Sequence, residues 1–368
     1  MSSQHRVALV IGAKGWRGSG TSFAKIAQGL TSRGHLVQVI VENERLARAF
    51  AGEGIATTTV EMPGTSLAVL RRFRRALSPV PDVVMVDGPR ELRLAALATL
   101  GWRTRLVFRY NLLFRRMLRD VVSRLFWTRI HAIVYQCEAI RRRALDESPW
   151  LGSRMSVRIP NGYDVDHFRP DPTARATVRE RLGISPDRLL VVTGGMPTKG
   201  KGHDTAVAAL AAAMRTAPPL SWIVLGDGER LEATRALATA AGLDAHFTGM
   251  LRPSAVAEML AAADVVLHPA THEIFPNAVA EAMASGAAAV ATDAGGTAEL
   301  VGDDGIAGVL VPVGDVPAMA GAVTGLLVDP HRRAAMGVAA RARIAAEFPV
   351  ERMVAGYEQL VRTLVASG

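Results

Sequence analysis

Cysteine is almost missing from the 368-residue sequence, which has only Cys137. A single cysteine excludes an internal disulfide framework, and without a CxxC pair or a Cys/His cluster there is no zinc motif. Aromatic residues make up only 5%, so the rings that stack on bases in single-stranded nucleic-acid binders are scarce. No window approaches the roughly 18 apolar residues of a membrane-spanning helix. We therefore expect a reducing, cytoplasmic compartment, no metal and no nucleic-acid partner.

Charge is present in quantity, but it is unevenly divided along the chain. Residues 1–160 contain 26 Lys and Arg against 11 Asp and Glu, whereas residues 161–368 contain 17 against 23. A basic half indicates an anionic partner such as a phosphate, a nucleic acid or an acidic membrane surface, or simply an arginine-rich solvated surface. With 368 residues, 49% of them hydrophobic, the chain is long enough and apolar enough to bury two cores.

The sequence predicts an α/β fold with two doubly wound, Rossmann-like domains that face a central cleft. Short apolar runs ending in Gly or Asp alternate with helical stretches, as in parallel strands joined by crossover helices. Prolines, glycine and aspartates cluster at 158–174, so we expect one domain over 1–165 and another over 166–349, with a last helix at 350–366. The expected strands are 6–11, 36–41, 83–86, 106–109, 132–135, 189–193, 221–225, 245–247, 265–268 and 288–292.

A glycine-rich stretch follows the first strand. Gly12, Gly15, Gly18 and Gly20 precede a helix expected to begin near Thr21. Glycines there let backbone amides approach an anion, so a phosphate-facing loop is one interpretation and a structural turn is another. A dinucleotide site with Glu42 as the ribose-binding acid is disfavoured, because the spacing is G-x-x-G-x-x-G-x-G and not G-x-G-x-x-G.

The stretch "THEIFPNAVAEAMASG" places two acids around a helix start. Asn277 is a favourable N-cap, so we expect a helix from Ala278 that ends at Gly286. Glu273 then lies in the preceding loop and Glu281 on the second turn. The first-turn amides offer an anion site, and the carboxylates can accept hydrogen bonds from hydroxyl groups. A nucleotide sugar fits this arrangement, while a favourable helix start with a solvated Glu273 is the simpler alternative.

Several motifs together resemble the retaining glycosyltransferases of family 4, which have the GT-B fold. The motifs are "RIPNGYDVDHFRP", "KGHDTAVAAL", "IVLGDGERLEA", "FTGML", "AADVVLHPA", "EIFPNAVAEAMASG" and "ATDAGGTAELV", and they occur in family order over residues 158–301. The resemblance implies a donor-binding second domain, an acceptor-binding first domain and a C-terminal helix that packs back on the first domain. The N-terminal half matches more loosely, through the glycine loop, "LTSRGHLVQVIVE" and "RLVFRYN".

The resemblance also implies roles for individual residues. Glu273 would bind the donor sugar, Glu281 the ribose and Lys201 the diphosphate, with Glu273 and Lys201 as the catalytic pair. The expected substrate is a nucleotide-diphosphate sugar. Because the family needs no metal, we expect no cofactor. The other implied donor-binding residues are Gly15, Gly18, Lys199, Met250, Leu251, Phe275, Pro276, Asn277, Ala278, Gly295, Gly296 and Glu299.

Two positions depart from the family pattern. Met196 replaces an arginine that the family usually has, so Lys199 or Arg17 would supply the charge. Tyr110 and Asn111 stand where the family commonly has a His-Asp or His-Gly pair, and with Arg109 they are the expected acceptor-side residues. Donor choice and the proton path are therefore left open, as are a nucleotide-sugar epimerase and a non-catalytic nucleotide-sugar-binding protein.

Two basic, apolar stretches in the first half, residues 66–77 and 112–126, have the pattern of amphipathic helices. Such helices can lie on an acidic bilayer, which would bring a lipid-linked acceptor within reach at the inner membrane face. They can equally pack on the core and leave their arginines in water.

Overall fold

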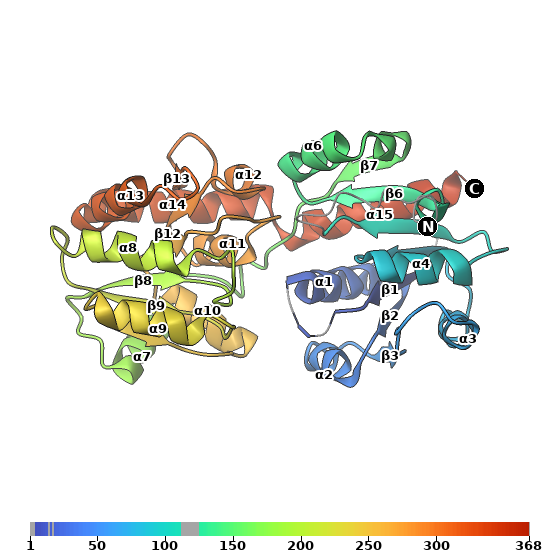
Figure 1. Cartoon of the computed structure of the whole chain (residues 1–368), viewed down its shortest axis with the longest axis horizontal. Coiled ribbons are helices and arrows are strands. Elements are labelled where there is room, and N and C mark those ends of the chain that lie inside the picture. Colours follow the sequence, from blue (N-terminus) through green and yellow to red (C-terminus); the bar gives the residue numbers. More distant parts are fainter. Residues whose placement is uncertain (1–3, 14, 17, 112–124, 368) are drawn as a thin grey trace. The chain divides into compact units, whose positions relative to one another are not determined.

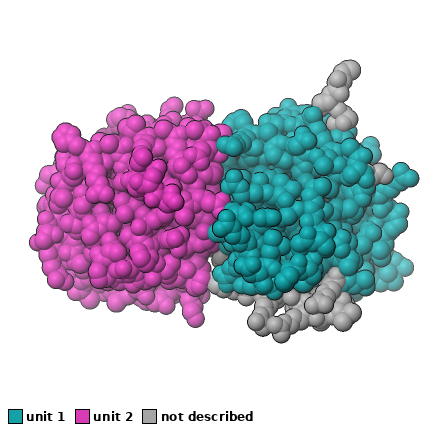
Figure 2. Space-filling view, turned by 90° about the horizontal axis from the view of Figure 1, so that it is seen from above, with its two compact units in different colours: residues 1–162, 350–368 teal, residues 163–349 magenta. Residues whose placement is uncertain are grey.

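We analysed a computed structural model, which describes residues 4–13, 15–16, 18–111 and 125–367. The chain divides into two compact units (Figure 2), the first formed by Met1–Gly162 with Val350–Gly368 and the second by Tyr163–Pro349. The division falls three residues before the expected boundary at 165. The C-terminal helix belongs to the first unit, as expected.

In the described part of the first unit, seven strands form one sheet in the order β3-β2-β1-β4-β5-β6-β7, and every pairing is parallel. Strands buried on both faces read as nearly continuous apolar runs, and "VVMV" of β4 is buried throughout. β3 and β7 were not predicted, because both are short, partly exposed and without an apolar run. The strands are β1 (Arg6–Ile11), β2 (Leu36–Val41), β3 (Thr57–Thr59), β4 (Val83–Val86), β5 (Arg105–Arg109), β6 (Ile130–Tyr135) and β7 (Met155–Arg158).

Helices cover this sheet, and α15 shares a core with α1 and strands β1, β2 and β4 (Figure 1). The prediction that α1 begins near Thr21 was wrong. It begins at Gly18, so Gly18 and Gly20 lie in its first turn, and Gly20 is buried against the ring of Trp16. The helices are α1 (Gly18–Ser32), α2 (Glu44–Gly52), α3 (Leu67–Ala76), α4 (Pro89–Ala98), α6 (Glu138–Glu147), the 3-10 helix η1 (Pro149–Ser153) and α15 (Val350–Ala366).

The basic helix α3 packs on the core. Val69, Phe73 and the following Leu77 are buried, and the Arg74 guanidinium lies 4.1 Å from the ring centroid of Trp102. Its apolar face is therefore largely covered within the unit, although Leu67 is exposed. The second basic stretch falls mostly on residues 112–124, outside the described part. No described helix is both long and apolar enough to cross a membrane.

In the second unit, the described strands form a parallel sheet in the order β10-β9-β8-β11-β12-β13. They are β8 (Leu189–Thr193), β9 (Leu220–Val224), β10 (Ala245–Phe247), β11 (Val265–His268), β12 (Ala288–Thr292) and β13 (Gly308–Val311), and β13 was not predicted. The helices are α7 (Pro172–Leu182), α8 (His203–Ala213), α9 (Leu231–Ala240), α10 (Pro253–Ala261), α11 (Asn277–Ala284), α12 (Thr297–Val301), α13 (Val316–Val328) and α14 (Pro330–Glu347). Because the strands are parallel, the loops after β8 to β12 share the carboxyl edge, where ligands of such sheets bind.

Candidate functional site

A buried carboxylate lies at the carboxyl edge of the second sheet. Glu273 follows β11, is 9% exposed and contacts Lys201 Nζ from the loop after β8. Its Oε1 atom also lies 3.1 Å from His268 Nε2, at the end of β11. Two loops that are distant in sequence thus bring a carboxylate, a lysine ammonium group and a histidine together.

The Glu273 carboxyl is an acceptor at neutral pH. Burial by itself raises the pKa, but the hydrogen bond from His268 and the positive charge of Lys201 outweigh it and lower the pKa to about 2. An ionised carboxylate accepts hydrogen bonds and cannot donate them. The site is therefore suited to a ligand that presents donors, such as sugar hydroxyl groups.

Two glycines allow the loops to approach this closely. Gly202 has a φ of +68°, and a Cβ there would lie 1.9 Å from the carbonyl oxygen of Pro269. Gly295 has a φ of +58°, and a Cβ would lie 1.8 Å from the carbonyl oxygen of Glu273. Backbone hydrogen bonds from Thr271 N to Gly200 O (2.9 Å) and from Gly296 N to Ile274 O (3.0 Å) join the same loops.

The start of α11 differs from the prediction. Pro276 occupies the N-cap position and Asn277 is the first helical residue, with no side-chain cap. The Asn277 side chain instead accepts a hydrogen bond from Tyr163 Oη at 2.9 Å. The N–H of Ala278, in the first turn, has no acceptor in the described part of the chain. A helix start of this kind presents N–H groups to an anion.

The other predicted residues of the second unit follow the same edge. Lys199 is exposed, and its N–H donates to Glu229 Oε1 at 3.3 Å. Met250 is 59% exposed and Leu251 half-buried in the loop after β10. Phe275 is buried against Phe348, with ring centroids 5.6 Å apart. Half-buried Glu281 and Glu299 lie on α11 and α12, and Met196 lies in the loop after β8.

In the first unit, the expected acceptor-side residues are less available. Arg109 is buried and donates to Asn161 Oδ1 (2.7 Å) and Tyr357 Oη (3.2 Å). Tyr110 is buried beside the rings of Phe108 and Tyr135, and burial raises its pKa to about 12. Both side chains therefore have a packing role in the described structure, and their contact with an acceptor stays a prediction.

The other residues predicted in this unit belong to the glycine loop or were considered with it. Gly15 is half-buried in the loop before α1, and Asn111 is half-buried after β5. Arg17 lies outside the described residues. Glu42, considered as a ribose-binding acid, contacts the Arg90 guanidinium instead.

Sequence reasoning missed three titratable groups. Asp87 follows β4 and Glu91 is buried in α4 beside it, with Arg90 Nη2 3.1 Å from Glu91 Oε1. The signal was available, because "VVMVD" places an acid directly after an apolar strand.

The third group, His203, begins α8 and is buried. Burial, followed by the charges of His268 and Lys201, lowers its pKa to about 4, and neither ring nitrogen has a partner in the described part.

Asp87 is expected to make stability fall as pH rises. Burial raises its pKa from 3.8 to about 7, and Glu91 adds to this effect, while Arg109 and a hydrogen bond with Ser19 oppose it. The folded state then binds a proton that the unfolded state has lost, so this contribution is complete below the unfolded pKa and lost as pH rises through about 7. Because the Asp87 side chain remains partly exposed, we expect this contribution to the free energy of unfolding to fall by about 2 kcal/mol between about pH 4 and pH 8.

Asp87→Asn should remove this slope. Urea unfolding of both proteins at about pH 5 and pH 8 measures the free energy of unfolding. The readout is the difference between the wild type and the variant, because the histidines contribute equally to the pH dependence of both. An equal pH dependence in the two proteins would contradict the assignment.

Comparison with known proteins agrees with this architecture. The family model of glycosyl transferases group 1 matches residues 174–343, and that of the glycosyl transferase 4-like domain matches residues 17–162. A glycosyltransferase structure from Rickettsia africae superposes with a TM-score of 0.87 over 100% of both chains at 16% identity. Anabaena HepE in complex with UDP and glucose superposes with a TM-score of 0.86 at 19% identity, over 99% of this chain and 100% of that one.

Curated relatives match over a shorter length. A GDP-mannose-dependent alpha-(1-6)-phosphatidylinositol monomannoside mannosyltransferase of Mycolicibacterium smegmatis is 38% identical over 192 residues, 50% of each chain. A D-inositol 3-phosphate glycosyltransferase of Xylanimonas cellulosilytica is 37% identical over 198 residues, 50% of this chain and 46% of that one. The chain spans about half the length of the curated relatives it matches. With both units matched by the two family models, the chain belongs to the family 4 glycosyltransferases with the GT-B fold.

Proposed function

We propose that the chain transfers a sugar from a nucleotide-diphosphate sugar to a hydroxyl acceptor, with retention of anomeric configuration. The observation that carries the proposal is the ionised, buried Glu273 carboxylate beside Lys201 and the start of α11. An acceptor for hydroxyl groups, a cation and helix N–H groups stand at one sheet edge. A sugar attached to a diphosphate presents the matching donors and charges.

The donor-binding roles follow from the positions of the side chains. Glu273 would accept hydrogen bonds from the transferred sugar, and Glu281 from the ribose. Lys201, 31% exposed, would turn its ammonium group to the diphosphate when a donor binds. Met250, exposed after β10, would cover the base with Leu251. The N–H groups at the start of α11 would face the distal phosphate.

The chemical step would need no protein nucleophile. The bond between the anomeric carbon and the diphosphate oxygen breaks, the acceptor oxygen attacks from the same face, and the departing phosphate oxygen takes the acceptor's proton. Lys201 and the α11 amides would stabilise the charge that develops on the diphosphate. A metal would not be required, and this remains a prediction.

The relatives indicate which substrates to try first. The M. smegmatis enzyme is named as GDP-mannose-dependent and as acting on a phosphatidylinositol monomannoside, and the X. cellulosilytica enzyme is named for inositol 3-phosphate. We propose GDP-mannose as the first donor and an inositol-containing acceptor as the first acceptor. The first unit, with its polar edge around Asp87, would bind the acceptor.

A thermal-shift screen of UDP-, GDP-, ADP- and TDP-sugars tests the donor proposal. A ligand at about 100 times its Kd stabilises the folded state by about 2.7 kcal/mol, so a true donor should raise Tm clearly and the others little. If no nucleotide sugar changes Tm, the donor site is refuted. NMR of the incubated donor then separates the classes: slow hydrolysis indicates a transferase, an inverted sugar centre an epimerase, and no change a non-catalytic binder.

A further inference from the structure

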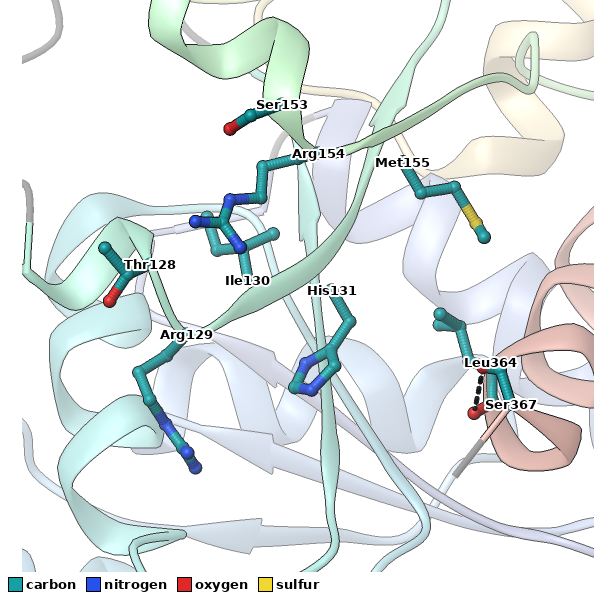
Figure 3. Close-up of a pocket in the computed structure, with 9 residues that line it drawn as sticks. All are labelled: Thr128, Arg129, Ile130, His131, Ser153, Arg154, Met155, Leu364 and Ser367. Carbon is teal, nitrogen blue, oxygen red and sulfur yellow. Dashed lines mark hydrogen bonds between the residues drawn. The ribbon is translucent and has the colours of Figure 1, made fainter.

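The pocket at the amino edge of the first sheet does not bring its charged groups to one ligand. It has a volume of about 290 Å³ and lies where β6 and β7 begin. The guanidinium groups of Arg129 and Arg154 point away from each other there (Figure 3). The Glu273 carboxylate of the second unit differs, because two side chains from separate elements converge on it.

Both of these side chains contact the same oxygen of Glu273. Lys201 Nζ and His268 Nε2 each lie against Oε1, the histidine nitrogen at 3.1 Å. The other oxygen, Oε2, has no hydrogen bond in the described part of the chain. It is not fully buried either, since Glu273 contributes none of the buried polar atoms that lack a partner there. One oxygen is therefore anchored, and the other is open to a ligand.

The two hydrogen-bond donors differ in how firmly they are held. The Lys201 side chain is 31% exposed and carries its ammonium group on a flexible four-carbon stem, so this group can turn to a diphosphate. The His268 side chain is 4% exposed, and its backbone pairs with Ala291 of β12. When Lys201 leaves Oε1 for a phosphate, His268 is the donor that stays.

The proton of the contact between His268 and Glu273 lies on His268 Nε2. The Glu273 carboxyl is ionised at neutral pH, and a carboxylate only accepts hydrogen bonds. The imidazole must therefore donate through Nε2, whichever charge the ring carries. Burial raises the pKa of Glu273, and the hydrogen bond from His268 is the largest of the effects that lower it. The same bond thus orients the carboxylate and keeps it ionised.

We infer that His268 is a positioning residue, which anchors Glu273 through Oε1 and leaves Oε2 to accept a hydrogen bond from the donor sugar. The anchor holds after Lys201 has turned to the diphosphate. The inference rests on the proposed function, because it assigns a sugar hydroxyl group as the ligand of Oε2. His268 itself touches neither the sugar nor the phosphate and acts only through Glu273.

Two replacements of His268 separate hydrogen bonding from packing. His268→Phe keeps a ring of similar size and removes the hydrogen-bond donor, whereas His268→Gln is smaller and keeps an N–H. Calorimetry measures the Kd of GDP-mannose, or of UDP-glucose if GDP-mannose does not bind. His268→Phe should weaken binding about tenfold or more, the worth of a hydrogen bond to a charged group. His268→Gln should stay within about threefold of the wild type. The reverse order would show a packing role and overturn the inference.

The nucleotide without its sugar is the second probe. GDP, or UDP where UDP-glucose is used, should bind the wild type and both variants with equal Kd, because Oε2 is assigned to the sugar alone. A general distortion of the site would weaken both probes, and that outcome would overturn the inference. Circular dichroism confirms that each variant is folded.

The chain offers a matched control in another histidine beside an acid. His246 Nε2, on β10 of the same unit, lies 3.3 Å from Asp244 Oδ1. His246→Phe should bind both probes like the wild type. In a Glu273→Ala background, His268→Phe should cause no further loss of affinity, because a residue that acts through Glu273 has nothing left to position. A further loss would overturn the inference.

Nitrogen-15 NMR of histidine-labelled protein tests the contact without a ligand. The His268 ring, assigned by the signals that His268→Gln removes, should carry its proton on Nε2, and Glu273→Gln should shift these signals. If Nε2 carries no proton, the inference fails even where sugar transfer proceeds. If the contact is seen and the affinities follow the expected order but no sugar is transferred, the transfer reaction fails and the inference stands. A wild type that binds neither nucleotide sugar overturns both.

Discussion

Glu273→Ala and Lys201→Ala should each lower turnover by about a hundredfold or more, the loss typical of one transition-state contact. The reason differs between the two. Without Glu273 the sugar hydroxyl groups lose a buried acceptor, whereas without Lys201 the departing diphosphate loses a positive charge. Initial rates with saturating donor measure both. Losses of this size would show that both side chains act in the reaction.

The contact between the two side chains makes a double variant informative. In the structure Lys201 Nζ contacts Glu273 directly, so Lys201 could act only by orienting the carboxylate. In that case Glu273→Ala/Lys201→Ala would be no slower than Glu273→Ala. If Lys201 binds the diphosphate itself, the double variant should be slower than either single variant, because residues with separate roles contribute separate losses.

Controls separate this effect from a general loss of folding. Glu232 has a side chain that is 82% exposed and pairs with Arg235 on the surface of α9, so Glu232→Gln should leave turnover unchanged. Glu273→Gln keeps the size of the side chain and removes its charge. Near-wild-type rates for Glu273→Ala or Lys201→Ala, with any donor that the native chain uses, would show that the site is elsewhere.

The strand pattern could be predicted well because parallel strands are buried on both faces. Runs such as "VALVI" of β1 and "VVLH" of β11 leave little choice between strand and loop. The short edge strands β3, β7 and β13 were not predicted, since an edge strand carries a weaker pattern and its pairing depends on a partner distant in sequence. The start of α11 was misplaced by one residue because Asn277 had a competing partner, Tyr163, more than 100 residues away.

The sequence places the candidate residues on their loops, but it does not show the contacts between them. Nothing in the spacing of Lys201 and Glu273 shows that they contact each other, because the loop after β8 meets the loop after β11 only in the folded sheet. The burial of Arg109 and Tyr110 was equally hidden. The resemblance made them expected acceptor-side residues, whereas in the structure Arg109 donates to Asn161 and Tyr110 packs beside the ring of Tyr135.

Gly295→Ala is expected to damage stability and turnover together. An added Cβ would lie 1.8 Å from the carbonyl oxygen of Glu273, and the φ of +58° already disfavours a side chain. The left-handed backbone costs about 1–2 kcal/mol. The backbone clash adds to this, so we expect a loss of about 3 kcal/mol or more. The loop must move to relieve the clash, and the Glu273 carboxylate moves with it.

Gly242→Ala isolates the contribution of the contact. Gly242 has a similar φ of +68°, lies in the same unit after α9 and has open space where a Cβ would stand. This variant should cost only the backbone term and keep wild-type turnover, whereas Gly295→Ala should lose at least tenfold in turnover, because a displacement of about 1 Å at a positioned group can cost a hundredfold. Urea unfolding and initial rates on the same preparations measure both quantities. If the two alanine variants lose equal stability and Gly295→Ala keeps full turnover, the close approach of Gly295 to Glu273 does not hold the carboxylate in place.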